Sequence, residues 1–408
     1  IEKCGEMLKL SGYQAMITQH AWMFLSSYEK LRSKLLQRDI VNMAHLGSRA
    51  FEEIGGEVVQ TTAFVLSKRD TTNFEATYVR LVDYGNQQAK EDAFVNGNDR
   101  YVAKKENFAS VPGNPIAYWM GDNFFKAFQG NLLGKTYETK KGMFTGDNGY
   151  FLRLWFEIAA NEVGSNYLFY NKGGGYQRWY GNDETVVKWH NNGFEIKAFK
   201  GSGNINESYF FKGCLTWNLV STAPFCCRII GDGHVMGDAG PICLAYDQNA
   251  YYALAYMNTR VCNFFMSVLN PTMNYPSGVV SKLPYKIDKS SLDAVISISK
   301  ISVELARADW DSFETSWDFK QHPLICGERR IAGAFDKWER EAKERFDTLK
   351  ANEEELNRIF IDIYGLQDEL TSEVEDKDVT VRKADLSRDI KSLISYAVGC
   401  MFGRYSLD

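Results

Sequence analysis

Hydrophobic and polar positions near the start of the chain alternate between helix-like and strand-like spacing. In residues 14–37, QAMITQHAWMFLSSYEKLRSKLLQ, apolar side chains recur with helix-like spacing at Met16, Trp22, Leu25, Leu31 and Leu35. Residues 39–47, DIVNMAHLG, predict a strand ending in a glycine turn, residues 48–56, SRAFEEIGG, a short helix, and residues 57–68, EVVQTTAFVLSK, another strand. This order predicts part of a doubly wound α/β sheet, because a complete one needs roughly 5–7 strands.

The rest of the chain divides by composition. A further strand is predicted in residues 74–84, FEATYVRLVDY, and the turn residues NGNDR indicate a linker over residues 83–107. Residues 108–286 are dense in aromatics, glycine and asparagine, which predicts a mixed, β-rich domain of short strands. Residues 287–408 are helical and charged, and Gly365 is placed to cap an amphipathic helix or helical hairpin. The predicted fold class is α/β and α+β, with domains at 1–82, 108–286 and 287–408.

The net charge hides two regions of opposite sign. The 408 residues carry a formal charge of -5. Residues 140–230 hold 10 Lys and Arg against 7 Asp and Glu, whereas residues 331–390 hold 10 against 17. An acidic helical region therefore masks a mildly basic centre, and the overall charge does not argue against a DNA partner.

Several function classes receive no support. The 8 cysteines form no C-x-x-C pair and the 5 histidines are dispersed, so we expect reduced thiols and no metal site. No Walker lysine loop, G-x-S-x-G or G-x-G-x-x-G motif is present. No apolar run approaches the ~18 residues of a membrane span, and the N-terminus is not basic. We expect a cytoplasmic chain without membrane contact; its first residue, Ile1, suggests that it begins within a longer protein.

Residues 171–182, NKGGGYQRWYGN, interleave basic and aromatic side chains around three glycines. Cations there can meet phosphates and flat rings can contact bases or sugars, which makes this a candidate DNA surface formed by Lys172, Tyr176, Arg178, Trp179 and Tyr180. The alternative is a glycine hairpin whose aromatics belong to the core. Sequence alone favours neither.

Two further segments carry side chains that could contact a DNA backbone. Residues 140–158 contain Thr145, Asn148 and Arg153 at a polar turn, although TGDN is also a common helix-capping turn. Residues 213–230 contain Thr216 and Arg228 with the same ambiguity.

Residues 113–119, GNPIAYW, raise the question of catalysis. Enzymes that methylate an exocyclic amine of a base carry Asn-Pro-Pro followed by an aromatic residue, which hold the amine and stack on the flipped base. Asn114, Pro115 and Tyr118 are present, but Ile116 and Ala117 separate the proline from the tyrosine.

Several long sequence blocks, in the same order along the chain, carry a resemblance to one protein family. The blocks MITQHAWMFLSSYEKLRSKLL, NMAHLGSRAFEEIGGEVVQTTAFVLSK, GMFTGDNGYFLRLWFE, NKGGGYQRWYGNDETVVKWHNNG, NPTMNYPSGVVSKLPY and NEEELNRIFIDIYGLQDEL resemble, in order, the adenine-specific DNA methyltransferases of the BREX phage-defence type, the PglX family. The match spans nearly the whole chain. It corresponds to the portion that follows the family's catalytic Asn-Pro-Pro-Tyr.

The resemblance implies a division of labour. Residues 1–82 would be the last part of the Rossmann-like methyltransferase sheet, residues 108–286 a target recognition domain that reads double-stranded DNA, and the remainder a helical C-terminal region. The catalytic and cofactor motifs would lie upstream, so GNPIAYW is an accident of composition and this chain has no catalytic residues of its own. S-adenosylmethionine would bind the full-length enzyme and not this chain alone.

Other expectations follow from the same resemblance. In related enzymes a late-strand aromatic stacks on the extruded adenine, for which Phe64 is a candidate; the alternative is a buried strand residue. Partners would be double-stranded DNA and, beyond it, other BREX components or a phage-encoded inhibitor. The competing hypothesis is a non-catalytic DNA- or protein-binding module, and a carbohydrate-binding or hydrolytic domain is a third.

Overall fold

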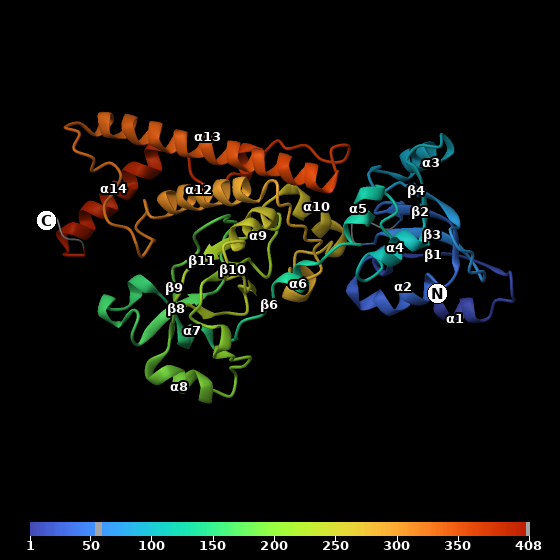
Figure 1. The fold of residues 1–408 in the computed structure, drawn as a ribbon, viewed down its shortest axis with the longest axis horizontal. Coiled ribbons are helices and arrows are strands. Elements are labelled where there is room, and N and C mark those ends of the chain that lie inside the picture. The colour runs from blue at the N-terminus through green and yellow to red at the C-terminus, as the bar shows by residue number, and fades with distance from the viewer. Residues whose placement is uncertain (54–58, 405–408) are drawn as a thin grey trace. The chain divides into compact units, whose positions relative to one another are not determined.

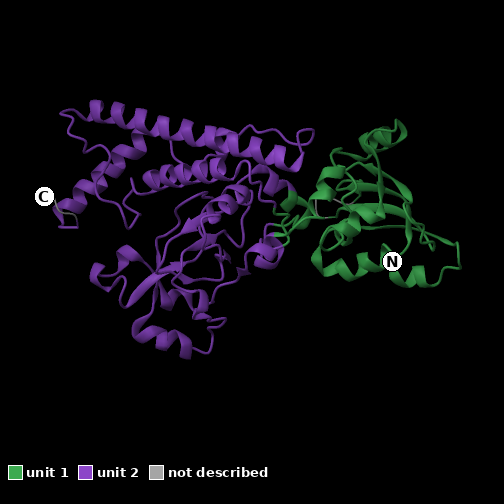
Figure 2. Ribbon diagram, in the orientation of Figure 1, with its two compact units in different colours: residues 1–132, 265–272, 282–285 green, residues 133–264, 273–281, 286–408 purple. Residues whose placement is uncertain are grey.

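The computed structural model describes residues 1–53 and 59–404 (Figure 1). The chain forms two compact units (Figure 2). Unit 1 comprises residues 1–132, 265–272 and 282–285, and unit 2 comprises residues 133–264, 273–281 and 286–408. The α/β and α+β fold class, with a helical C-terminal region, is confirmed.

Unit 1 is built on a five-stranded sheet of order β1-β3-β2-β4-β5. Its strands are β1 (Tyr13–Gln19), β2 (Asp39–Gly47), β3 (Thr61–Ser67), β4 (Glu75–Arg80) and β5 (Arg100–Lys104). Strand β3 is antiparallel to both β1 and β2, and β2 is parallel to β4. Strands β1, β2 and β4 therefore point the same way, and their carboxyl ends lie along one edge of the sheet.

Short helices connect or flank these strands. They are α1 (Glu2–Glu6), α2 (Glu29–Leu35), α3 (Gln87–Val95), α4 (Lys105–Ser110), α5 (Asp122–Ala127) and the 3-10 turns η1 (His20–Met23) and η2 (Ser26–Tyr28). The Arg32 guanidinium of α2 is buried and donates to the carbonyl oxygens of Trp22, Leu25 and Gly113 at 2.7–2.8 Å. A single cation thus fixes η1 and the start of the GNPIAYW segment against one helix.

Three local predictions in unit 1 need correction. Residues 13–19 form β1 rather than a helix, because Tyr13 to Gln19 pair in continuous register with β3, and the helix is confined to α2. Residues 83–107 include α3 and β5, and β5 pairs with β4, so most of the expected linker is regular structure. Residues 48–53 are not helical; the rest of the helix predicted at 48–56 lies outside the described residues.

Unit 2 contains two four-stranded sheets, of order β11-β10-β13-β6 and β12-β8-β9-β7. The strands are short: β6 (Thr139–Lys140), β7 (Leu152–Leu154), β8 (Tyr167–Asn171), β9 (Thr185–Lys188), β10 (Cys214–Thr216), β11 (Arg228–Ile230), β12 (Val235–Met236) and β13 (Ile242–Cys243). With them lie α6 (Leu133–Thr136), α7 (Asn148–Phe151) and α8 (His190–Ala198).

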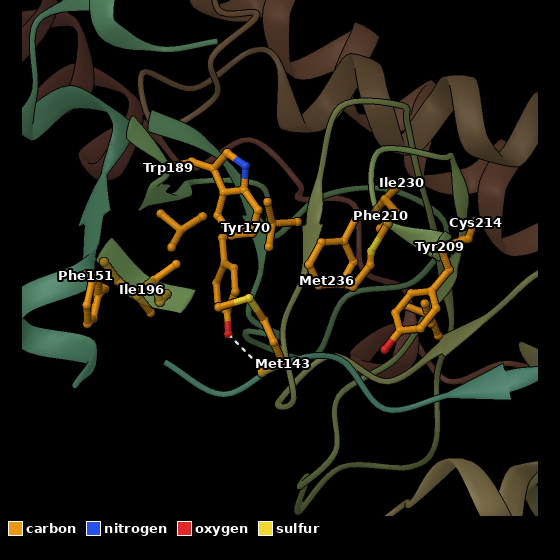
Figure 3. Packing of buried hydrophobic residues seen from close by; sticks show 14 residues of the cluster. Met143, Phe151, Tyr170, Trp189, Ile196, Tyr209, Phe210, Cys214, Ile230 and Met236 are labelled. Atoms are coloured by element: carbon orange, nitrogen blue, oxygen red, sulfur yellow. Dashed lines mark hydrogen bonds between the residues drawn. The ribbon is translucent and has the colours of Figure 1, made fainter. Parts of the chain in front are cut away.

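A buried cluster holds this β-rich part together (Figure 3). Phe151, Trp189 and Met236 are members, and the Tyr170 hydroxyl within it donates to the Met143 carbonyl oxygen at 2.9 Å. Buried polar atoms need such partners, because an unpaired one costs about 1–3 kcal/mol.

The later part of the chain is helical: α9 (Ala250–Met257), α10 (Arg260–Leu269), α11 (Ser277–Val280), α12 (Leu292–Trp310), α13 (Ile331–Tyr364) and α14 (Leu386–Met401). Helix α12 packs against α9 and runs beside α13 (Figure 1). The predicted amphipathic helix is confirmed as α13, a single 34-residue helix rather than a hairpin. It ends at Gly365, whose φ of 68° is left-handed, as predicted for a capping glycine.

Candidate nucleic-acid interface

The loop that follows β8 presents Lys172 to solvent on a fixed base. Asn171, the last residue of β8, is buried and its amide donates to Thr216 Oγ1 and to the Gly240 carbonyl oxygen, both at 2.8 Å. Gly173 follows with φ 86°, and a Cβ there would lie 2.8 Å from the Ala239 carbonyl oxygen. Glycine is therefore required at 173, and the loop leaves Lys172 exposed beside an anchored strand end.

Arg178 and Trp179 of the same segment point into the interior. Glu353 of α13 accepts hydrogen bonds from Arg178 Nη1 and from Trp179 Nε1, both at 2.8 Å. The three side chains are buried. Burial alone would lower the pKa of Arg178, but the Glu353 carboxylate raises it above its ordinary value, so the arginine stays charged. Arg178 and Trp179 therefore serve packing, which corrects the sequence-based prediction that they lie on a DNA-contacting surface.

Thr216 and Arg228 are also interior. Both are fully buried: Thr216 ends β10, which lies between β11 and β13, and Arg228 begins β11, which pairs with β10. Thr216 donates to the Pro241 carbonyl oxygen at 2.9 Å, and Arg228 Nη1 donates to Asn218 Oδ1 at 3.1 Å. Neither side chain reaches the surface of the described structure. Thr216 and Arg228 are therefore core residues and not residues that contact a DNA backbone.

The turn before α7 is the helix-capping turn that the sequence offered as one interpretation, and contact with DNA there stays a prediction. The Asp147 side chain caps α7 by accepting from the Tyr150 amide at 3.0 Å. Thr145 is buried and its hydroxyl donates to Asn148 Oδ1 at 2.6 Å, whereas Asn148 itself is exposed. Arg153 is half-buried and donates to the carbonyl oxygens of Gly149 and Leu152.

Two residues that the sequence interpretation missed extend this turn into a polar surface. Lys188, at the end of β9, donates to the Tyr150 hydroxyl at 3.1 Å and lies over its ring at 4.8 Å. Strands β7 and β9 pair, which brings Arg153 to the same sheet. We call Asn148, Tyr150, Arg153 and Lys188 the α7–β9 surface. The available signal was TVVK, in which polar Thr185 and Lys188 flank two apolar valines.

The remaining candidates lie partly exposed or deep in unit 1. Tyr176 and Tyr180 are half-buried, and the Arg307 guanidinium lies 4.8 Å above the Tyr180 ring. Phe64 on β3 is 2% exposed and packs edge-on against Trp22 at 5.3 Å, the arrangement of a core residue.

The GNPIAYW segment is also engaged in packing. The Tyr118 ring is buried and stacks on Tyr78 at 4.7 Å with an interplanar angle of 6°, and its hydroxyl hydrogen-bonds His45 Nδ1 at 3.1 Å. The stacked face and the hydroxyl thus serve the core of unit 1 rather than a base.

The described part of the chain has neither a group of metal ligands nor a membrane-spanning helix. No group of three or more His, Cys, Asp or Glu side chains gathers there as metal ligands. Within the same residues, no helix is long and apolar enough to cross a membrane.

Comparison with known proteins gives the class of protein: the chain is similar, over its whole length, to adenine-specific methyltransferases. It is 42% identical to the adenine-specific methyltransferase PglX of Lacticaseibacillus casei (strain Zhang), over 100% of this chain and 36% of that protein. It is 34% identical to the adenine-specific methyltransferase BrxX of Escherichia coli O9:H4 (strain HS), over 98% and 35%. The predicted resemblance is confirmed, and the chain spans about a third of the length of these curated relatives.

Solved structures give a more distant likeness. The Type IIL restriction-modification enzyme MmeI in complex with DNA matches 88% of this chain and 48% of its own, with a TM-score of 0.47 and 13% identity. The Type ISP enzyme LlaGI with a DNA substrate mimic matches 74% and 30%, with a TM-score of 0.43 and 11% identity. No family model matches the sequence.

Proposed function

We propose that this chain is the DNA-recognition and C-terminal portion of an S-adenosylmethionine-dependent adenine-N6 DNA methyltransferase that acts in BREX-type phage defence. The observation that carries the proposal is the 42% identity to PglX along the entire chain, which covers only 36% of that protein. The complete enzyme would flip an adenine out of the duplex and transfer a methyl group to its amine. Cofactor binding and catalysis would belong to the part of the relatives that this chain does not match.

Within the proposal, residues 1–82 end the methyltransferase sheet, residues 108–286 read DNA and residues 287–408 support them. Exposed Lys172 and the α7–β9 surface would contact the DNA backbone, and the carboxamide of Asn148 would be available to base edges. Tyr176 and Tyr180 would flank this contact. The buried residues Arg178, Trp179, Thr216 and Arg228 would hold the loops that carry it. The remaining partners, other BREX components or a phage-encoded inhibitor, would act in the cytoplasm.

The test is the salt dependence of duplex binding. Each phosphate contact that is lost should reduce the slope of log affinity against log salt by about 0.9, because each contact releases condensed counterions. We expect Lys172→Ala with Lys188→Ala to weaken binding of a mixed-sequence duplex and to flatten this slope, measured by fluorescence anisotropy between low and moderate salt. Lys391→Ala, which removes an exposed lysine of α14, is the matched control.

Three outcomes separate the hypotheses. Duplex binding without S-adenosylmethionine binding by calorimetry is the result that the proposal expects. Unchanged affinity and slope in the double variant would remove the assigned surface. Absence of duplex binding would favour the module that binds a protein partner.

A further inference from the structure

A pocket in unit 1 lies at the edge of the sheet where the carboxyl ends of β1, β2 and β4 meet. It has a volume of about 390 Å³ and its lining includes His20, Phe24, His45, Arg80 and Trp119. His20 directly follows β1, His45 lies near the end of β2, and Arg80 is the last residue of β4. Open α/β sheets bind ligands in the crevice outside the carboxyl ends of their strands, and small-molecule sites occupy ~300–1,000 Å³.

Two aromatic side chains and two imidazoles contribute to the walls of the pocket, and among the described residues that line it Arg80 carries the one formal charge. Trp119 and Phe24 meet edge to face at 5.7 Å, and the Arg80 guanidinium lies 5.3 Å from the Trp119 ring centre. Among the described residues that line it there is no carboxylate. Arg80 has an ion pair with Asp83 at 3.5 Å, but Asp83 is exposed and does not line the pocket, and exposed ion pairs contribute little free energy.

Two neutral imidazoles add hydrogen-bonding capacity without charge. His20 Nδ1 and His45 Nε2 are 2.7 Å apart, and His45 Nδ1 bonds the Tyr118 hydroxyl at 3.1 Å. Burial lowers the pKa of His45 to about 3 and also lowers the pKa of His20, so both rings are neutral near pH 7. If Tyr118 donates, His20 Nε2 carries the proton; if Tyr118 accepts, His20 Nε2 is the acceptor. Depending on the tautomers of the two histidines, His20 Nε2 can therefore donate a hydrogen bond to a ligand atom or accept one from it.

Flat apolar walls, one guanidinium and an adaptable donor or acceptor together fit a base joined to a phosphate. We propose that this pocket binds a nucleotide, with the base against the aromatic walls, its edge toward His20 and its phosphate on Arg80. The ligand could be a nucleotide of single-stranded nucleic acid or a free mononucleotide. The inference uses unit 1 alone and does not require that unit 2 recognises duplex DNA.

The experiment titrates the full chain with adenosine monophosphate by calorimetry, beside adenosine and inorganic phosphate. We expect the monophosphate to bind at least about tenfold more tightly than either fragment, and Trp119→Leu or Arg80→Ala to weaken it about tenfold, as loss of a stacking or phosphate contact does. Trp119→Phe, which keeps a flat ring, should retain most of the affinity. Arg100→Ala, which removes an arginine of β5 outside this pocket, should change nothing.

A short single-stranded oligonucleotide then identifies the source. If it displaces the monophosphate and binds more tightly, the ligand is nucleic acid; if it does not compete, the ligand is a free nucleotide. No heat of binding at millimolar monophosphate, or affinity unchanged in both Trp119→Leu and Arg80→Ala variants with unaltered unfolding midpoints, overturns the proposal. Loss of duplex binding in the Lys172 and Lys188 variant with monophosphate binding intact would support DNA recognition by unit 2 and leave the unit 1 pocket as a separate nucleotide site.

Discussion

The Arg178 guanidinium and the Glu353 carboxylate form a buried ion pair across 175 residues of sequence, with Nη1 and Oε2 2.8 Å apart. The pair joins the loop after β8 to the middle of α13, and the same carboxylate receives the Trp179 indole N–H. The helical C-terminal region is therefore part of the structural support of the candidate DNA surface. Removing residues from 331 onward would expose this charge and disturb unit 2 as well as any partner site.

The first prediction concerns this pair. Glu353→Ala should lower the free energy of unfolding by about 3–5 kcal/mol, because it leaves the Arg178 cation buried without a counter-charge. Replacing both residues by apolar ones, Arg178→Met with Glu353→Leu, should recover most of that loss. Urea unfolding followed by circular dichroism measures both effects.

The control for this prediction is Glu344→Ala, an exposed carboxylate on the same helix, which should stay within about 0.5 kcal/mol of the parent chain. If Glu353→Ala is as stable as Glu344→Ala, the ion pair contributes no net stability. In that case Arg178 is free to leave the interior, and direct contact with DNA becomes the better account of its role.

The second prediction concerns the turn that carries the α7–β9 surface. Gly146 has φ 77°, and a Cβ there would lie 2.3 Å from the Gly201 carbonyl carbon. Gly146→Ala should therefore lower the free energy of unfolding of unit 2. The left-handed backbone alone costs about 1–3 kcal/mol for alanine, and the clash with the Gly201 backbone adds to this cost. Duplex affinity should fall with it, because Asn148 and Tyr150 follow directly.

Gly149→Ala supplies the comparison, because its Cβ would meet nothing closer than 3.4 Å and it lies in the same turn. It should leave both the unfolding midpoint and duplex affinity near those of the parent chain. Equal effects of the two substitutions on duplex affinity would mean that DNA binding does not depend on the position of this turn.

How far the sequence predicted the fold depends on the range of the interaction involved. Gly365 and the periodicity of α13 are local features, and both predictions held. The segment QAMITQ was predicted as helix because its spacing suits either periodicity, and only pairing with β3, more than 40 residues later, decides for a strand. The fate of Arg178 is set by Glu353, a partner that no local pattern indicates.

The candidate sites show the same division. The composition of NKGGGYQRWYGN fits a DNA surface and a glycine hairpin with core aromatics equally well, and burial separates exposed Lys172 from interior Arg178 and Trp179. The unit 1 pocket could not be predicted, because Arg80 and Trp119 lie in segments that the sequence assigned to a strand and to a fortuitous motif. Only the sheet edge brings them together.

The third prediction is a loss of stability in mild acid that originates at His45. Burial lowers the pKa of this imidazole to about 3 in the folded chain, and the charges of His20, Arg80 and Lys90 act in the same direction. In the unfolded chain its pKa is about 6.5. The unfolded state therefore takes up the proton first as the pH falls, so the contribution to stability is complete above about pH 6.5 and is lost from there toward pH 3.

The expected loss is about 1.4 kcal/mol per pH unit in this window, or about 2 kcal/mol between pH 7 and pH 5. His45→Gln keeps a neutral hydrogen-bonding group and removes the titration, so its unfolding free energy should fall less than that of the parent chain over the same interval. His190→Gln, at an exposed position, should follow the parent chain.

The measurement is urea unfolding of the three proteins at pH 7 and pH 5. A fall in His45→Gln as steep as in the parent chain would mean that His45 takes up its proton in the folded state with little penalty, contrary to the burial that lowers its pKa.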